Sequence, residues 1–348
     1  MSEKKDIRLL SLNELVFFCK ENQLPTYRAK QIYEWLWKKN VKSFDDMSSI
    51  SQKTRNMLDN FFWINHIKIH SKNKSDDDTI KYGIMLHDKN LIEGVLIPSK
   101  KRITACISSQ AGCSLSCNFC ATGKLNLKRN LTTSEIYDQV YLLNEEAKKH
   151  FEKPITNIVY MGMGEPLLNY NSLIKSIDFI TSEKGLNMSP KRITVSTVGI
   201  AKLIKKLADD MVKFNLAISL HSAQDSKRSN LMPINDKINL NLLKEAVEYF
   251  FKKTKTRVTY EYILLRNIND SIYDAKKLLE FIKITPCKIN LIEYNTVSDF
   301  EFRKSTRKKT DLFINFLEKH NVIVNLRRSK GKDINAACGQ LANQNEFQ

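Results

Sequence analysis

The sequence predicts an α/β fold: an open, partial (βα)6 barrel preceded by a small helical domain and a connecting β-hairpin. Short amphipathic patterns occupy the residues up to about 62, and strand-like runs alternate with longer helical patterns from about residue 101 onward. Between these regions, the polar turn 88–90 separates two strand-like runs. We therefore assign residues 1–75 to a helical accessory domain, 76–100 to a β-hairpin linker and 101–348 to the barrel core.

The N-terminal region is expected to contain three short helices. Ser11 and Glu14 have the spacing of a capping box at the start of the first, the second follows Pro25, and the third covers about residues 51–62. Basic side chains such as Arg28 mark the second helix. This pattern suits a nucleic-acid-binding adaptor, and it suits a structural cap on the core equally well.

The hairpin is expected to pair residues 80–87 with residues 91–97. Further strand-like runs follow it at residues 103–108, 156–161, 192–197, 214–220, 258–264, 288–293 and 322–326. Helical patterns lie between most of them, and this alternation predicts parallel strands joined by right-handed crossovers. About six such units are too few to close an eight-fold barrel, and βα folds place their chemistry at the carboxyl ends of the strands.

The chain of 348 residues has a formal net charge of +18 and seven cysteines. The excess of cations suits a polyanion such as a nucleic acid, although a lysine-rich genome composition would raise the charge as well. No apolar run is long enough to span a bilayer, and the first residues do not form a secretory signal, so we expect a cytoplasmic protein without membrane contact. In a reducing compartment, the cysteines indicate metal-binding or catalytic thiols rather than a disulfide framework.

Cys113, Cys117 and Cys120 form a C-x3-C-x2-C motif directly after the first strand of the predicted barrel. Three thiolates so close in the sequence share one loop, and thiolates bind zinc or iron–sulfur clusters. A structural zinc site needs four ligands, usually as two short pairs, and a second pair is absent from the sequence here. Three ligands on a four-iron cluster would leave one iron open, so the motif favours a catalytic [4Fe–4S] cluster.

A C-x3-C-x-aromatic-C loop after the first strand of a partial βα barrel resembles the radical S-adenosylmethionine (SAM) superfamily. In that superfamily the open iron binds SAM, and reduction of the cluster cleaves SAM to a 5′-deoxyadenosyl radical. A Gly-Glu segment after the second strand binds the SAM amino group there, and Gly164 and Glu165 occupy the corresponding place here. Glycine permits a close approach of the backbone, and a glutamate can pair with an ammonium group.

The closer resemblance is to the RlmN-type 23S rRNA adenine-C2 methyltransferases, some of which also modify transfer RNA. It extends over nearly the whole chain and includes the segments 27–33, 108–113, 162–167, 217–221 and 334–341. It implies that SAM is held by Gly164, Glu165, Ser196, Ser219, Leu220, His221 and Asn295. For His221 or Asn295 alone, a satisfied polar group at a strand end would be the ordinary interpretation.

The resemblance also implies a mechanism with two SAM molecules per turnover. The first methylates Cys338, and the radical from the second removes hydrogen from that S-methyl group, so that a methylene radical adds to adenine C2. Glu93 takes the place of the proton acceptor, and Cys106 then attacks the sulfur of Cys338, which leaves a transient Cys106–Cys338 disulfide and methylated RNA. A glutamate on a hairpin is otherwise usually a solvated surface charge. Cys338 lies in a glycine-flanked loop, which suits an exposed and mobile nucleophile.

The resemblance implies as partners 23S rRNA, free or in an assembling large subunit, with the target adenine in the peptidyl transferase centre. It also implies transfer RNA, at the adenine 3′ to the anticodon, and an electron donor such as a flavodoxin or ferredoxin; we expect a monomer. Three other functions remain open: the sibling adenine-C8 methyltransferase of antibiotic resistance, a radical SAM enzyme acting on a small molecule, and a non-enzymatic zinc-dependent RNA-binding protein. Cys19 and Cys287 lie in apolar patterns and are expected in the core.

Overall fold

The computed structural model describes residues 4–183, 185–297 and 301–342. Its largest sheet consists of β3 (Lys68–Lys74), β4 (Ile80–Met85), β5 (Leu91–Pro98), β6 (Ile103–Cys106), β9 (Asn157–Tyr160), β10 (Ile193–Thr197), β11 (Asn215–Ser219), β12 (Val258–Leu264), β13 (Cys287–Glu293) and β14 (Val324–Arg327). From β6 to β14 neighbouring strands pair in parallel, and β5, β4 and β3 extend the sheet in antiparallel pairs. The barrel strands predicted from the sequence are confirmed within two residues at each end.

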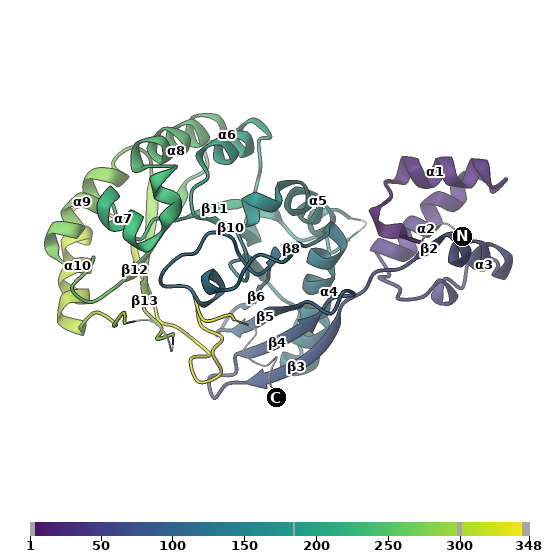
Figure 1. Ribbon diagram of the computed structural model, residues 1–348, viewed down its shortest axis with the longest axis horizontal. Coiled ribbons are helices and arrows are strands. Elements are labelled where there is room, and N and C mark those ends of the chain that lie inside the picture. The colour runs from purple at the N-terminus through teal and green to yellow at the C-terminus, as the bar shows by residue number, and fades with distance from the viewer. Residues whose placement is uncertain (1–3, 184, 298–300, 343–348) are drawn as a thin grey trace.

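Helices connect the parallel strands and form an arc around them (Figure 1). They are α4 (Thr133–Phe151), α5 (Tyr170–Thr181), α6 (Ala201–Asp209), α7 (Asp225–Leu231), α8 (Leu240–Thr254), α9 (Ile272–Ile282) and α10 (Arg307–Lys319). The sheet ends at β14 on one side and at β3 on the other, so the barrel stays open, as expected from the number of βα units. No helix of the described residues is long and apolar enough to cross a membrane.

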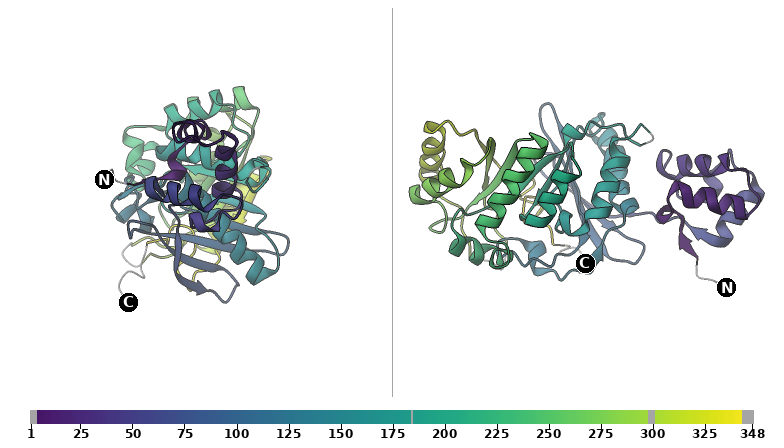
Figure 2. Two further views of the ribbon diagram at one scale, coloured as in Figure 1. Left: turned by 90° about the vertical axis from the view of Figure 1, so that its right-hand side faces the viewer. Right: turned by 90° about the horizontal axis from the view of Figure 1, so that it is seen from above.

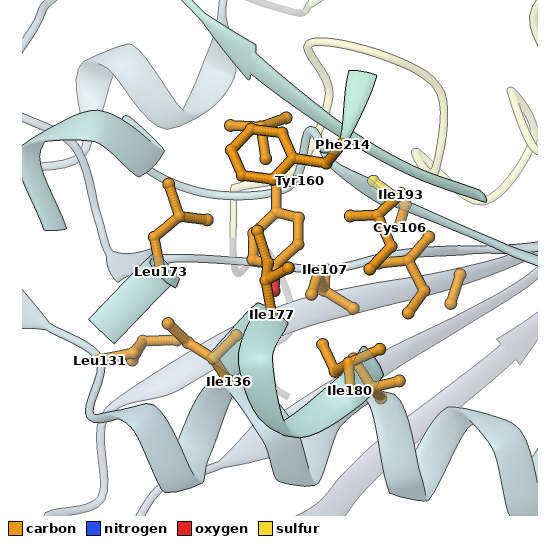
Figure 3. Close-up of a cluster of buried hydrophobic side chains, with 14 of the residues drawn as sticks. Cys106, Ile107, Leu131, Ile136, Tyr160, Leu173, Ile177, Ile180, Ile193 and Phe214 are labelled. Carbon is orange, nitrogen blue, oxygen red and sulfur yellow. The ribbon is translucent and has the colours of Figure 1, made fainter. Parts of the chain in front are cut away.

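The hydrophobic core lies between the sheet and the helices that cover it. Figure 3 shows one part, where Ile136 of α4 and Ile177 of α5 pack with Tyr160 and Ile193 from the strands. Strand β12 is buried along its whole length, which is typical of a parallel strand covered on both faces. The core therefore fixes the strand ends, where the candidate site lies.

The N-terminal helices form a separate lobe at one end of the molecule (Figure 2). Between residues 4 and 64 the described chain has the helices α1 (Leu12–Glu21), α2 (Tyr27–Trp37) and α3 (Gln52–Phe61), as predicted. The capping box is confirmed, because the Ser11 hydroxyl accepts from the Glu14 backbone and the Glu14 carboxylate accepts from the Ser11 backbone at 2.6 Å. Cys19 is fully buried in this lobe, and Cys287 is partly buried against the main core.

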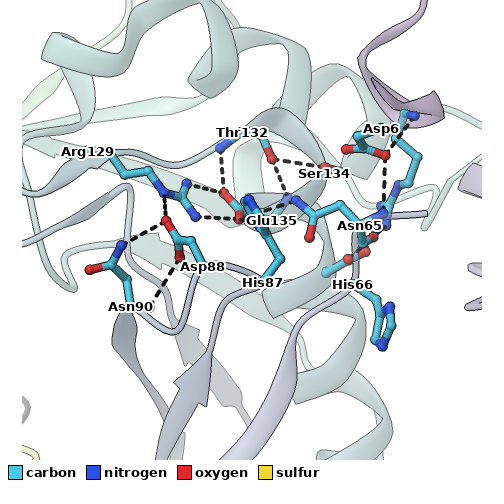
Figure 4. A network of polar contacts seen from close by, with 12 residues as sticks. Asp6, Asn65, His66, His87, Asp88, Asn90, Arg129, Thr132, Ser134 and Glu135 are labelled. Atoms are coloured by element: carbon cyan, nitrogen blue, oxygen red, sulfur yellow. Dashed lines mark hydrogen bonds and ion pairs between the residues drawn. The ribbon is translucent and has the colours of Figure 1, made fainter. Parts of the chain in front are cut away.

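Buried polar contacts attach this lobe to α4. Arg8 donates to both carboxylate oxygens of Asp138, at 2.8 and 2.7 Å, and neither side chain is exposed. The Asn65 side chain donates to Glu135, which also receives two hydrogen bonds from Arg129 at 2.8 Å (Figure 4). Since burying such groups is favourable only when they are paired, this network fixes the lobe against the barrel.

The sequence did not lead us to expect β3, which lies wholly inside the segment assigned to the helical domain. It pairs with β4 and adds an edge strand to the main sheet, so the expected hairpin of β4 and β5 is part of a three-stranded antiparallel extension. Nearly all side chains of β3 are exposed. An edge strand of this kind needs no apolar face and therefore carries no hydrophobic pattern.

Candidate active site

Cys113, Cys117 and Cys120 lie on one loop after β6, at the carboxyl end of the barrel. The short strands β7 (Gln110–Ala111) and β8 (Arg129–Asn130) pair and close the base of this loop. All three cysteines are partly buried, and burial raises the pKa of the Cys113 thiol to about 11. Within the described residues, no three His, Cys, Asp or Glu side chains are placed to share a single metal ion. Three thiols on a single loop fit three irons of an iron–sulfur cluster, whereas a structural zinc site takes four ligands.

Gly164 and Glu165 lie on the segment that leaves β9 and line the same cavity as Cys120. Gly164 has a φ of +93°, and a Cβ atom there would lie 2.5 Å from the Cβ of Gln110, so this position requires glycine. The buried Glu165 carboxylate accepts a hydrogen bond from the Val198 backbone at 2.9 Å. Burial raises the pKa of Glu165 to about 7. A ligand ammonium group beside it would stabilise the ionised form.

Other residues expected to hold SAM lie at the carboxyl ends of β10 and β11. The hydroxyl oxygens of Ser196 and Ser219 are 3.4 Å apart. The Nδ1 atom of His221 accepts from the Ile263 backbone at 3.1 Å, and burial lowers the pKa of His221 to about 3, so its ring is neutral at neutral pH. The Leu220 side chain is fully buried in the core, which leaves its backbone as the part that could reach a ligand.

Asn295 follows β13 and contacts the C-terminal segment. Its side-chain nitrogen donates to the carbonyl of Cys338 at 3.2 Å. Its side-chain oxygen is buried and has no hydrogen-bond partner among the described residues. Because a buried polar atom without a partner is costly, this oxygen suits a ligand that donates a hydrogen bond.

An open cavity lies between the cysteine loop and the carboxyl ends of β10 and β11. Residues that the sequence analysis selected meet in its wall: Cys120, Gly164, Glu165, Ser196, Ser219, His221 and Cys338. Phe119, Tyr160 and Ile263 add apolar surface. Apolar walls with a few convergent polar groups are typical of a cofactor site.

Glu93 and Cys106 share one face of the sheet. Val95 pairs with Cys106 across β5 and β6, and Glu93 lies two residues before Val95, so its side chain points to the same side. Glu93 is buried, unlike the solvated glutamate that a hairpin position suggests. One of its oxygens lies 3.0 Å from the Lys81 ammonium, and the other accepts from the Ala342 backbone at 2.9 Å.

Cys106 ends β6 beside the hydrophobic cluster of Figure 3. Burial raises the pKa of its thiol to about 12, and the nearby Cys338 adds to the increase. Of the four cysteines outside the C-x3-C-x2-C motif, Cys106 and Cys338 lie near enough for the charge of one to affect the other, although they come from distant parts of the sequence.

The Cys338 side chain is exposed, as expected, but its loop is held on both sides. Before it, Asp333 accepts a hydrogen bond from the Ser75 hydroxyl at 2.6 Å. After it, the Gly339 carbonyl accepts from the Ala121 backbone at 2.8 Å. The exposure expected for Cys338 is therefore found, and the residues on either side of it are hydrogen-bonded to other parts of the chain.

The sequence analysis missed three charged residues at the site. Lys81 pairs with Glu93, and Glu261 and Arg327 line the cavity. Glu261 is buried in the middle of β12 and accepts from the Asn290 side chain at 2.7 Å. A single charged residue inside a strand of otherwise uncharged residues was the signal that could have identified it.

Two family models match the chain. Residues 6–64 match the ribosomal RNA large subunit methyltransferase N-terminal domain, and residues 107–279 match the radical SAM superfamily. Two relatives named "Probable dual-specificity RNA methyltransferase RlmN" are similar over nearly their whole length. The protein of Flavobacterium johnsoniae is 52% identical over 98% of both chains, and that of Cytophaga hutchinsonii is 54% identical over 98% of this chain and 93% of the relative.

A solved structure agrees with these matches. The crystal structure of a radical SAM methyltransferase from Sphaerobacter thermophilus has a TM-score of 0.90 and 34% identity, covering 97% of this chain and 99% of the other. The expected radical SAM fold with an N-terminal domain is thereby confirmed. The enzyme uses a [4Fe–4S] cluster and SAM, as its superfamily does. The chain belongs to the RlmN family of radical SAM RNA methyltransferases.

Proposed function

We propose that this enzyme methylates carbon C2 of one adenine in the peptidyl transferase centre of 23S rRNA, and of the adenine 3′ to the anticodon in some transfer RNAs. The names of the relatives, dual-specificity RNA methyltransferases, support two classes of RNA substrate. The N-terminal match to a ribosomal RNA methyltransferase domain and the net charge of +18 support an RNA partner.

The nearness of Cys106 to Cys338, which lines the cavity, is the observation that carries the choice of chemistry. Adenine C2 is an electron-poor aromatic carbon, so it cannot attack the methyl group of SAM directly. One thiol that first accepts the methyl group and a second thiol that releases the product avoid this difficulty. An ordinary methyl transfer to a nucleophilic atom would need neither thiol.

The described residues fit both cofactors. Cys113, Cys117 and Cys120 would hold the cluster, the carboxylate of Glu165 would bind the amino group of SAM, and the unpartnered oxygen of Asn295 would accept a further hydrogen bond. Ser196, Ser219, His221 and the backbone of Gly164 and Leu220 would complete the SAM site. When bound, the cluster and SAM supply the methyl group and the radical that removes a hydrogen atom from it.

Each remaining step falls to a side chain of this enzyme. Cys338 accepts the methyl group on its sulfur. After the methylene radical has added to adenine C2, the adduct loses one electron, which balances the electron spent on cleaving SAM, and Glu93 accepts the proton that C2 loses. The thiolate of Cys106 then attacks the sulfur of Cys338. The bond between that sulfur and the methylene carbon breaks, and a Cys106–Cys338 disulfide forms. The carbon keeps the electron pair of the broken bond and takes up one proton, equal in number to the proton that Glu93 accepted, to become the methyl group. A thiol reductant reopens the disulfide, and a flavodoxin or ferredoxin supplies the electrons that reduce the cluster. The proposed enzyme is cytoplasmic and monomeric.

The proposal is tested by anaerobic incubation of the reconstituted enzyme with SAM, a reductant and unmodified 23S rRNA or transfer RNA, followed by nucleoside mass spectrometry against C2- and C8-methyladenosine standards. We expect 2-methyladenosine in both RNAs. Cys338→Ala is the matched control, because it should keep its cluster and form no methylated RNA. A C8-methylated product would assign the enzyme to the sibling activity. A purified protein that contains zinc but neither iron nor sulfide would refute the proposal of an enzyme.

A further inference from the structure

Arg228 on α7 is buried without a charged hydrogen-bond partner. Only 1% of its surface is exposed. In the described part of the chain, its guanidinium donates to neutral groups, namely the carbonyl oxygens of Val198, Ser219 and Leu220 and the side-chain oxygen of Asn235. A buried cation is costly unless something compensates its charge. Asp225 compensates part of this charge, because it acts on Arg228 electrostatically and accepts from the same Asn235 side chain at 2.9 Å. The guanidinium nevertheless binds backbone carbonyls rather than this carboxylate, which calls for an explanation beyond packing.

The three carbonyls belong to the strand ends that carry the candidate SAM residues. The Nη2 atom of Arg228 lies 2.6 Å from the Val198 oxygen and 3.3 Å from the Ser219 oxygen, and Nε lies 3.1 Å from the Leu220 oxygen. The backbone nitrogen of Val198 donates to Glu165 at the same time. One side chain thus connects the ends of β10 and β11 with the carboxylate proposed to bind SAM.

The same helix supports the cysteine loop. The backbone of Asn118 donates to the Leu231 carbonyl at 2.9 Å, and its side chain donates to the Asn230 carbonyl at 2.6 Å. Cys117 packs against the hydrophobic cluster that includes Leu231. Burial lowers the pKa of Arg228 to about 10, with Cys117 acting in the opposite direction, so the guanidinium stays charged at neutral pH.

We propose that Arg228 is a positioning residue for both cofactors: it fixes the backbone that binds SAM and holds a positive charge beside the cysteine loop. This inference rests on the roles proposed above for Glu165 and the three cysteines. A cation next to an iron–sulfur cluster stabilises the electron that reduction adds, so Arg228 should make the cluster easier to reduce.

Two substitutions separate the two effects. Arg228→Met removes the charge and all the donors, whereas Arg228→Lys keeps the charge but cannot bridge three carbonyls with planar geometry. Arg192→Met is the matched control, because Arg192 is exposed at the start of β10, the end of the strand opposite the site. Each protein is reconstituted anaerobically and compared in iron and sulfide content, in cluster midpoint potential without SAM, and in SAM affinity.

We expect Arg228→Met to have a more negative midpoint potential and a SAM affinity lower by roughly tenfold or more. Arg228→Lys should keep the wild-type potential and lose about tenfold in SAM affinity, and Arg192→Met should change neither. A wild-type potential in fully loaded Arg228→Met, or a wild-type SAM affinity in Arg228→Lys, overturns the proposal. If Arg228→Met takes up no iron, the SAM affinity of Arg228→Lys decides, and a wild-type affinity in that variant overturns the proposal. A wild-type chain that binds neither cofactor would instead refute the proposed function, so the two failures are distinct.

Discussion

The buried ion pair of Lys81 and Glu93 offers a direct test of how the site is held together. Both side chains are 4% exposed, and their charged atoms are 3.0 Å apart. Lys81→Met keeps the length of the aliphatic chain but leaves the carboxylate, among the described residues, with the Ala342 amide as its remaining partner. Removing one member of a buried pair costs roughly 3–5 kcal/mol, because the other charge stays buried without compensation. We expect the free energy of unfolding to fall by about 3 kcal/mol or more at neutral pH.

Urea unfolding of the cluster-free chain, followed by circular dichroism, measures this loss. Tryptophan fluorescence is unsuitable, because the chain has three tryptophans, Trp35, Trp37 and Trp63, all in or next to the N-terminal lobe. The double variant Lys81→Met/Glu93→Gln removes both charges and should regain at least half of the lost stability. A loss below about 1 kcal/mol in the single variant, or no recovery in the double variant, would refute the reasoning.

Three further predictions concern the Cys106 thiol, the Glu165 carboxylate proposed to bind SAM, and the junction of the N-terminal lobe. Cys106→Ala should let Cys338 accept its methyl group and then stall as a covalent protein–RNA adduct, visible as a nuclease-sensitive band on a denaturing gel; normal turnover would contradict the proposed order of steps. The pKa of Glu165 is about 7 in the folded chain against an ordinary 4.5, so its contribution to stability is complete below pH 4.5 and is lost as the pH rises through 7. In cluster-free protein, the free energy of unfolding of Glu165→Gln should therefore rise relative to the wild type by up to about 3 kcal/mol between pH 4.5 and about 8. A difference in unfolding free energy that does not change with pH would count against this assignment. Arg8→Met should leave the buried Asp138 unpaired, destabilise the junction by about 3 kcal/mol and speed protease cleavage near residues 64–68, whereas an unchanged cleavage rate would show that this pair does not hold the lobe.

Local sequence patterns predicted most of the fold. The barrel strands could be located because parallel strands covered on both faces are nearly continuous apolar runs, as β12 illustrates. The start of α1 followed from the spacing of Ser11 and Glu14. Strand β3 could not be predicted, because its side chains face solvent and its pairing with β4 is made through the backbone.

The residues of the candidate site likewise divide into those that a local sequence pattern predicts and those that depend on distant partners. The cysteine motif and the segment at Gly164 are contiguous, so a single sequence reveals them. The burial of Glu93 depends on Lys81 from a neighbouring strand and on Ala342 near the end of the chain. No local pattern contains such a pairing, which is why the sequence suggested a solvated glutamate. Arg228 was hidden for a related reason, since its role depends on carbonyl groups that every residue possesses.

The C-terminal loop connects these parts through its backbone. The Cys338 carbonyl accepts a hydrogen bond from Asn295, and the Gly339 carbonyl accepts one from the backbone of Ala121, directly after Cys120. The Ala342 amide donates a hydrogen bond to Glu93. Each of the three contacts therefore joins Cys338 to one group proposed for the reaction: the SAM site, the cluster loop and the proton acceptor. None of them uses the Cys338 side chain. In the proposed reaction the sulfur can thus exchange partners while the loop keeps its place, and we expect a substitution of this cysteine to remove the chemistry and to leave the surrounding architecture intact.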